Sequence, residues 1–93
     1  MSLPAWLRKF FDLDEQQRET RMSETDVLAT ARAAVEAEGR PWQEPVRVDI
    51  LPGRRGRSDI WEVLTNANML GSNVKVWIED QTGQVVRLWV LPR

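Results

Sequence analysis

The side chains of this sequence that could do chemistry are carboxylates and arginines, because its 93 residues include no histidine and no cysteine. Catalysis by Ser-His-Asp or Cys-His arrangements is therefore excluded, as are thiolate metal sites and disulfide bonds. Acid–base catalysis needs two carboxylates in different environments, and the candidates fall on strand faces or in a turn. We therefore predict no catalytic residue, no cofactor and no metal site. The candidate carboxylates are Asp49, Glu62, Glu79 and Asp80.

Three arginines stand close together in the segment 52–58, which reads Pro-Gly-Arg-Arg-Gly-Arg-Ser. A phosphate or nucleic-acid contact through Arg54, Arg55 and Arg57 is one interpretation, and a solvated tip between two strands is the other. The segment lacks interleaved aromatic residues and is not a phosphate-binding loop of the P-loop kind. The whole chain has 13 basic and 14 acidic residues, a net charge of −1 that does not favour nucleic acid.

The clearest structural pattern is a predicted hairpin from Val74 to Leu91. Two β-prone segments flank Asp80-Gln81-Thr82-Gly83, a turn with glycine where a positive φ is usually needed. A three-residue loop with Gly83 as a G1 bulge would pair residue 79 with 85, 78 with 86 and 77 with 87. The same register would continue as 76 with 88, 75 with 89 and 74 with 90.

This register sorts the side chains of the hairpin into two kinds, because they alternate between the faces of a sheet. One face would carry the aliphatic residues Ile78, Val86, Val76, Leu88, Val74 and Val90. The other would carry Glu79, Val85, Trp77, Arg87, Lys75 and Trp89. On that second face the indoles oppose cations, which is either ordinary cross-strand pairing or part of a partner-binding surface with cation–π contacts.

The middle of the chain predicts one long helix and two further strands. A capping-box-like start at Ser23 and an apolar stripe with small residues indicate a helix over 23–38, which the glycine and proline after it would end. Segments 46–50 and 60–64 alternate as strands, with Glu62 outward and Trp61 and Val63 inward. The loop 66–73 carries an apolar Met-Leu pair, which is either a plug under the loop or an exposed contact.

Residues 1–22 are predicted to be a separate unit, a short amphipathic helix over Ser2–Leu13 followed by a polar linker. The helix could lie on a membrane surface or a partner, or pack against its own domain or across a dimer. No stretch is long and apolar enough to span a membrane, and the first residues do not resemble a signal peptide. We therefore expect a cytoplasmic protein.

The predicted fold class is α+β, with an α-β-β-β-β domain over 23–93. One long helix packs on a four-stranded antiparallel meander sheet and is preceded by the short N-terminal helix. The long helix would cover the aliphatic face of the sheet. The outer face would then expose a larger apolar patch than a monomer usually leaves in contact with water. The Ser2–Leu13 helix, a second copy or a different protein could cover it. The predicted partner-binding residues are Trp77, Trp89, Arg87, Lys75, Leu64 and Ile60.

The stretch from Ser23 to the end resembles the PepSY domain, whose shape is similar to the cystatin fold. The resemblance lies in the helix with small apolar residues, in Trp61-Glu62-Val63, and in the alternating strand from Val74 that leads into Asp80-Gln81-Thr82-Gly83-Gln84-Val85. It implies a non-catalytic domain that binds or inhibits other proteins, often peptidases. Such domains usually act outside the cytoplasm, whereas this sequence shows no export signal.

Together, these patterns predict a small non-enzymatic binding or regulatory module that acts through the outer sheet face, with a homodimer as one form. Two alternatives stay open at this point. One is a PepSY-like inhibitor of a peptidase or another enzyme. The other is a phosphate or nucleic-acid contact through the arginines of the segment 52–58.

Overall fold

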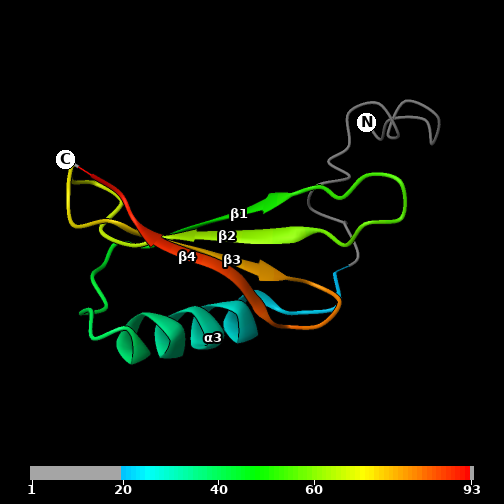
Figure 1. Ribbon diagram of the computed structural model, residues 1–93, viewed down its shortest axis with the longest axis horizontal. Coiled ribbons are helices and arrows are strands. Elements are labelled where there is room, and N and C mark those ends of the chain that lie inside the picture. Colours follow the sequence, from blue (N-terminus) through cyan, green and yellow to red (C-terminus); the bar gives the residue numbers. More distant parts are fainter. Residues whose placement is uncertain (1–19, 93) are drawn as a thin grey trace, which may run out of the picture.

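The computed structural model describes residues 20–92, which form one helix and one four-stranded antiparallel sheet (Figure 1). The elements are α3 (Glu24–Ala37), β1 (Arg47–Leu51), β2 (Ile60–Leu64), β3 (Val74–Glu79) and β4 (Val85–Val90). Strands that follow one another in the chain are neighbours in the sheet, in the order β1-β2-β3-β4. The predicted α+β fold, with one helix on an antiparallel meander, is confirmed. The helix predicted over Ser2–Leu13 lies outside the described residues.

Local signals in the sequence account for both ends of α3. The Ser23 hydroxyl oxygen accepts a hydrogen bond from the Asp26 N–H at 3.1 Å, which is the first half of a capping box. Glu24 and Asp26 place negative charge in the first turn, at the positive end of the helix dipole. After the C-cap at Glu38, Gly39 adopts a φ of +76°, a left-handed conformation that favours glycine.

Within the described residues 20–92, no helix is long and apolar enough to cross a membrane.

The core lies between α3 and one face of the sheet (Figure 1). On the helix, Val27, Ala31 and Val35 are fully buried, one turn apart from each other. Strands β2 and β3 meet them with side chains paired in register, Trp61 with Ile78 and Val63 with Val76. The core cluster is completed by Val74. Trp61 and Val63 therefore point inward, as predicted.

The β3–β4 hairpin has the predicted register over most of its length and a different one near its turn. The pairs 74 with 90, 75 with 89, 76 with 88 and 77 with 87 are confirmed. The predicted pairs 78 with 86 and 79 with 85 are wrong, because Ile78 pairs with Val85 and the Glu79 N–H donates to the Gln84 carbonyl at 2.9 Å. Gly83 has the predicted positive φ, +72°.

A β-bulge at Val86 causes this shift, because the strand gains one residue between Val85 and Arg87 relative to β3. Val86 lines a depression on the outer face together with Trp77 and Arg87, while Val85 faces the core residue Ile78. The prediction that Val86 faces the helix and Val85 the outer face is therefore wrong. Neither side chain is well covered, with 51% of Val86 and 38% of Val85 exposed.

The loop between β2 and β3 presents its apolar tip to solvent. The buried Asn73 side chain donates from Nδ2 to the carbonyls of Thr65, Asn66 and Met69, and its Oδ1 accepts from the Gly71 N–H. These four hydrogen bonds join Asn73 to the backbone of the loop. Leu70 is 94% exposed and Met69 is 62% exposed, so the tip is not a plug under the loop.

Truncation of a central core residue tests this packing. Ile78→Ala removes a fully buried side chain from the core cluster, and we expect the free energy of unfolding to fall by about 2–5 kcal/mol. The control is Val86→Ala on the neighbouring strand, where 51% of the side chain is exposed, with an expected change within about 0.5 kcal/mol. Urea unfolding followed by tryptophan emission measures both. Equal losses in the two variants would contradict this description of the core.

Candidate functional site

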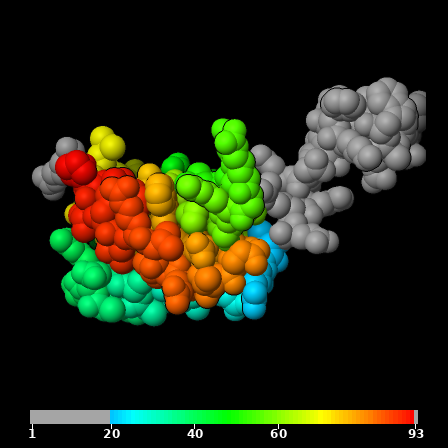
Figure 2. Space-filling model, turned by 45° about the vertical axis from the view of Figure 1, so that its right-hand side comes forward, coloured from blue at the N-terminus to red at the C-terminus, as the bar shows by residue number. Residues whose placement is uncertain are grey.

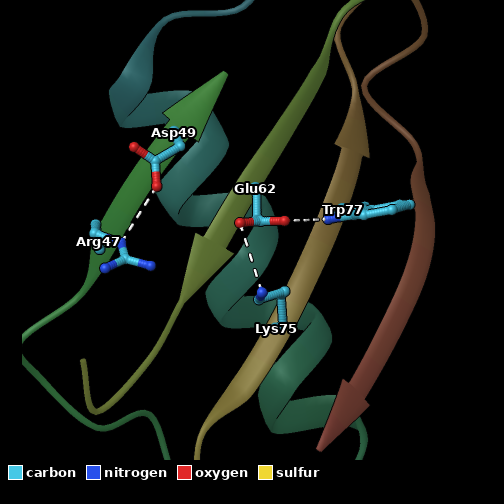
Figure 3. Close-up of polar contacts among 5 residues, drawn as sticks. All are labelled: Arg47, Asp49, Glu62, Lys75 and Trp77. Atoms are coloured by element: carbon cyan, nitrogen blue, oxygen red, sulfur yellow. Dashed lines mark hydrogen bonds and ion pairs between the residues drawn. The ribbon is translucent and has the colours of Figure 1, made fainter. Parts of the chain in front are cut away.

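The outer face, defined as the sheet face turned away from α3, is built from alternate residues of all four strands. The register places Glu62 opposite Trp77 and Lys75 opposite Trp89, with Arg87 beside Trp77 on β4. Figure 3 shows Glu62, Lys75 and Trp77 on this face, with α3 behind the sheet. The indoles and cations therefore gather on the face where the alternation predicted them.

Five outer-face residues, Glu62, Lys75, Trp77, Arg87 and Trp89, form what we call the aromatic–cation cluster. The two indole rings meet edge to face, with centroids 5.2 Å apart and an angle of 89° between their planes. The Arg87 guanidinium carbon lies 4.2 Å from the Trp89 ring centroid and 5.7 Å from that of Trp77, and Lys75 Nζ lies 5.8 Å from Trp89. Both half-buried indoles therefore have a cation within the range of a cation–π contact.

Glu62 is the residue that joins this cluster to β2. Its Oε2 accepts a hydrogen bond from Trp77 Nε1 at 2.7 Å, and its Oε1 lies 3.7 Å from Lys75 Nζ (Figure 3). The side chains of Glu62 and Lys75 are only 15% and 23% exposed. Sequence reasoning placed Glu62 outward but missed its role here, because only the β2–β3 register shows that it faces Trp77.

An open depression of about 740 Å³ lies next to the cluster on the same face. Ile60, Trp77 and Val86 line it with apolar surface, and Arg57 and Arg87 line it with positive charge. Figure 2 shows the segment between β1 and β2, in bright green, standing out from the surface beside the orange β3–β4 hairpin. The sequence suggested the arginine segment and the outer face as separate sites, and the structure brings them together here.

Hydrogen bonds from backbone N–H groups hold the arginine segment in shape and against the β3–β4 turn. The Gln81 N–H donates to the Ser58 hydroxyl oxygen at 3.0 Å, and the Asp80 N–H donates to the Asp59 carbonyl at 3.0 Å. The Gly53 N–H donates to Asp59 Oδ1 at 2.8 Å. A Cβ on residue 53 would clash with the Arg57 carbonyl oxygen, so only glycine allows this close approach. The position of Arg57 at the depression follows from this tight loop.

Asp80 is a buried carboxylate near the site and is only 2% exposed. Its carboxylate accepts hydrogen bonds from the Arg21 N–H at 2.8 Å, the Met22 N–H at 2.9 Å and Trp61 Nε1 at 2.9 Å. Burial raises the pKa of Asp80 and the nearby Asp59 raises it further, but the three hydrogen bonds lower it more, so the net pKa lies below its ordinary value. Asp80 therefore stays ionised at neutral pH and stabilises the fold.

The other candidate carboxylates are also engaged by neighbouring side chains. Asp49 Oδ2 lies 3.3 Å from Arg47 Nε on β1 (Figure 3), and Glu79 Oε1 accepts a hydrogen bond from the Thr82 hydroxyl at 3.0 Å. In the part of the chain that the structure describes, no group of three or more acidic residues is placed to hold a metal ion.

The remaining predicted site residues differ in how much surface they offer. Ile60 is half-buried and lines the depression. Leu64 lies opposite Lys75 on the outer face but is only 9% exposed. Of the six predicted residues, the structure therefore brings Trp77, Trp89, Arg87 and Lys75 into one connected group and places Ile60 beside it.

No family model, curated protein or solved structure matches the chain. The resemblance to the PepSY domain accordingly stays a prediction from the sequence.

The lowered pKa of Asp80 makes the stability of the fold depend on pH. A carboxylate whose pKa is lower in the folded chain stabilises the fold above its unfolded pKa, about 3.9, and this contribution is lost as the pH falls through the folded pKa. Asp80→Asn should therefore lower the free energy of unfolding at neutral pH by about 1–3 kcal/mol. The difference from the wild type should shrink as the solution is acidified below the unfolded pKa. Urea unfolding at a series of pH values measures it.

The control for this pH series is Asp49→Asn, because the Asp49 side chain is 52% exposed and forms an ion pair with Arg47 on its own strand. Its effect should stay within about 0.5 kcal/mol at every pH. A difference between Asp80→Asn and the wild type that did not change with pH would rule out the linkage.

Proposed function

We propose that this chain is a non-enzymatic protein-binding module that uses its outer sheet face. The observation that carries the proposal is the aromatic–cation cluster beside an open, partly apolar depression, on the sheet face that α3 leaves uncovered. Tryptophan and arginine are the residues that most often dominate the energy of protein interfaces. A face that brings Trp77 and Trp89 together with Arg57 and Arg87 is suited to bind another protein.

The contacts within the cluster support this proposal because they hold the side chains in place before a partner arrives. Trp77 is fixed by its hydrogen bond to Glu62 and by the edge of Trp89, and Arg87 lies against both rings. Side chains that are already ordered lose less conformational entropy on binding. The cluster therefore offers a preformed contact surface.

The charges around the depression indicate the chemistry of the partner. Arg57 and Arg87 both line it, and Arg57 is exposed and has no ion pair among residues 20–92. Glu79 also lines the depression, so its charged lining consists of two cationic side chains and one acidic one. The partner we propose is an extended protein segment with acidic side chains next to a bulky apolar one, which would enter the depression.

The segment that contains α3, on the opposite side of the sheet, has an excess of acidic over basic side chains. Between residues 24 and 44, the segment that contains α3, acidic side chains outnumber basic ones, with Glu24, Asp26, Glu36, Glu38 and Glu44 against Arg32 and Arg40. Residues 45–92, which contain the sheet, carry six basic and five acidic side chains, so the charge separation lies between an acidic helix side and a sheet that is close to neutral overall. Such a separation orients an acidic partner toward the outer face.

The state of Asp80 supports a non-enzymatic function. A general acid or base works best when its pKa lies near the working pH, whereas the pKa of Asp80 is shifted downward, away from neutral pH. Its three donors also occupy the carboxylate, which is nearly inaccessible to a substrate.

Selection from a displayed library of random peptides tests the proposed function. Peptides selected on the wild-type chain should combine acidic residues with a bulky apolar residue. Trp77→Ala should weaken the binding of these peptides by about 2 kcal/mol or more, roughly thirtyfold, as expected for an interface anchor. The control Leu70→Ala removes an apolar side chain that is 94% exposed on the β2–β3 loop and should leave the affinity unchanged. Isothermal titration calorimetry measures both.

A charge-matched pair of variants separates binding at the depression from general charge attraction. Arg57→Glu should weaken the binding of the selected peptides, while Arg32→Glu on α3 should have little effect. Selection of no acidic peptide, or equal losses in the two charge variants, would overturn the proposal. Circular dichroism shows whether each variant is folded.

One observation favours a second candidate function, a phosphate contact by the arginine segment. Arg54, Arg55 and Arg57 are all exposed, and none forms an ion pair within the described part of the chain. If this segment binds nucleic acid, a labelled single-stranded oligonucleotide should show an anisotropy increase at low salt that falls as salt rises. Replacement of Arg54 and Arg55 by glutamine should reduce the increase. Absence of any increase at low salt removes this function.

A further inference from the structure

Strand β4 has an edge that no other strand of residues 20–92 covers. The Leu91 N–H donates to the Asn73 carbonyl on the β3 side at 2.9 Å. Hydrogen-bonded pairs alternate along an antiparallel ladder, so the backbone of Trp89 also faces its partner Lys75 on β3. The backbone N–H and C=O groups of Leu88 and Val90 consequently point to the free edge.

The β4 edge also exposes apolar side chains, unlike the other edge of the sheet. Three of the exposed large apolar residues belong to β4, Val85 at 38%, Val86 at 51% and Val90 at 37%. Edge strands that remain single are usually protected by charge, proline or short length. At the opposite edge, β1 has five residues, lies between Pro45 and Pro52, and carries the Arg47–Asp49 ion pair. The β4 edge has less of this protection and is open to pairing.

We infer that β4 pairs antiparallel with β4 of a second copy of the chain, which joins the two sheets into one. Each bonded pair needs free backbone groups on both strands, and Leu88 and Val90 supply them. Leu88 then pairs with Val90 of the second copy, and Val90 pairs with its Leu88. This register places the two Trp89 residues opposite each other at the two-fold axis, where antiparallel side chains approach closely.

Repulsion between the two Arg87 residues favours this register over the alternative in which Leu88 pairs with Leu88 of the second copy. In the alternative, the Arg87 residues of the two copies would lie two positions apart along the strands, about 7 Å, and the bulged residue Val86 would have to pair with Val90. In the proposed register Arg87 faces Leu91 of the second copy. The two Arg87 residues are then four positions apart, about 13 Å, which exceeds the screening length of about 8 Å at physiological salt.

This dimer goes beyond the binding function proposed above, because it uses the edge of β4 and not the depression. It would place two outer faces side by side on one continuous sheet, so that a partner with two acidic segments could bind both. Either proposal can fail alone. The dimer is measured by mass, and the depression by peptide binding.

The first test is sedimentation of the full chain from micromolar to millimolar concentration. The mass should rise from 10.8 kDa toward twice that value. Val90→Pro removes an N–H that the monomer does not use, and proline is tolerated on an edge strand at such a position. Each dimer then loses two of its four inter-strand hydrogen bonds, so the dissociation constant should rise at least about tenfold. The control Leu70→Ser, on the β2–β3 loop, should dimerise like the wild type.

The second test compares two variants that place opposite charges at position 91. The carboxylate introduced by Leu91→Glu would face Arg87 of the second copy and should tighten the dimer, whereas Leu91→Arg would oppose two cations and weaken it. A folding defect cannot explain both changes. A wild-type chain that stays monomeric at every concentration overturns the inference. So does a dimer that responds to neither Val90→Pro nor the Leu91 pair, because the segment 2–13 or the Leu70 tip would then form it. Peptide binding by the Val90→Pro monomer reports on the proposed function separately.

Discussion

The arrangement of residues 20–92 depends most on one buried carboxylate. Asp80, at the turn after β3, accepts hydrogen bonds from the backbone of Arg21 and Met22 and from the Trp61 indole. A carboxylate that is only 2% exposed would strongly destabilise the fold without such donors. These bonds therefore fix three parts of the chain relative to one another: the entry to α3, strand β2 and the β3–β4 turn.

The proposed binding surface is formed at the same end of the sheet as these bonds. The segment between β1 and β2 is fastened to the β3–β4 turn through Ser58 and Asp59, which brings Arg57 to the depression that Trp77 lines. The Trp77 indole N–H donates a hydrogen bond to Glu62. The outer face is thus ordered by its own contacts in the free chain, while the β4 edge keeps unpaired backbone groups. The proposed protein binding follows from aromatic surface that the chain leaves partly uncovered. The proposed β4 pairing follows from backbone hydrogen-bonding groups that have no partner strand.

Much of this architecture could be predicted from the sequence, because it follows from interactions between near neighbours in the chain. The cap at Ser23 and the positive φ of Gly83 are local properties of a helix start and a turn. The alternation of β3 assigns each side chain to a face without knowledge of the partner strand. For this reason the helix-on-meander fold, the inward position of Trp61 and the outer position of Trp77 and Trp89 could all be predicted.

The features that complete the site were decided only by tertiary structure. The bulge at Val86 exchanges two valines between faces, and a pattern of period two contains no signal for it because both residues are the same. The hydrogen bond from Trp77 to Glu62 depends on how β2 and β3 align. The position of Arg57 depends on a loop held by hydrogen bonds to the Ser58 and Asp59 side chains. The donors to Asp80 come from up to 59 positions away. Contacts between distant segments set these positions, and the order of residues along the chain does not reveal them.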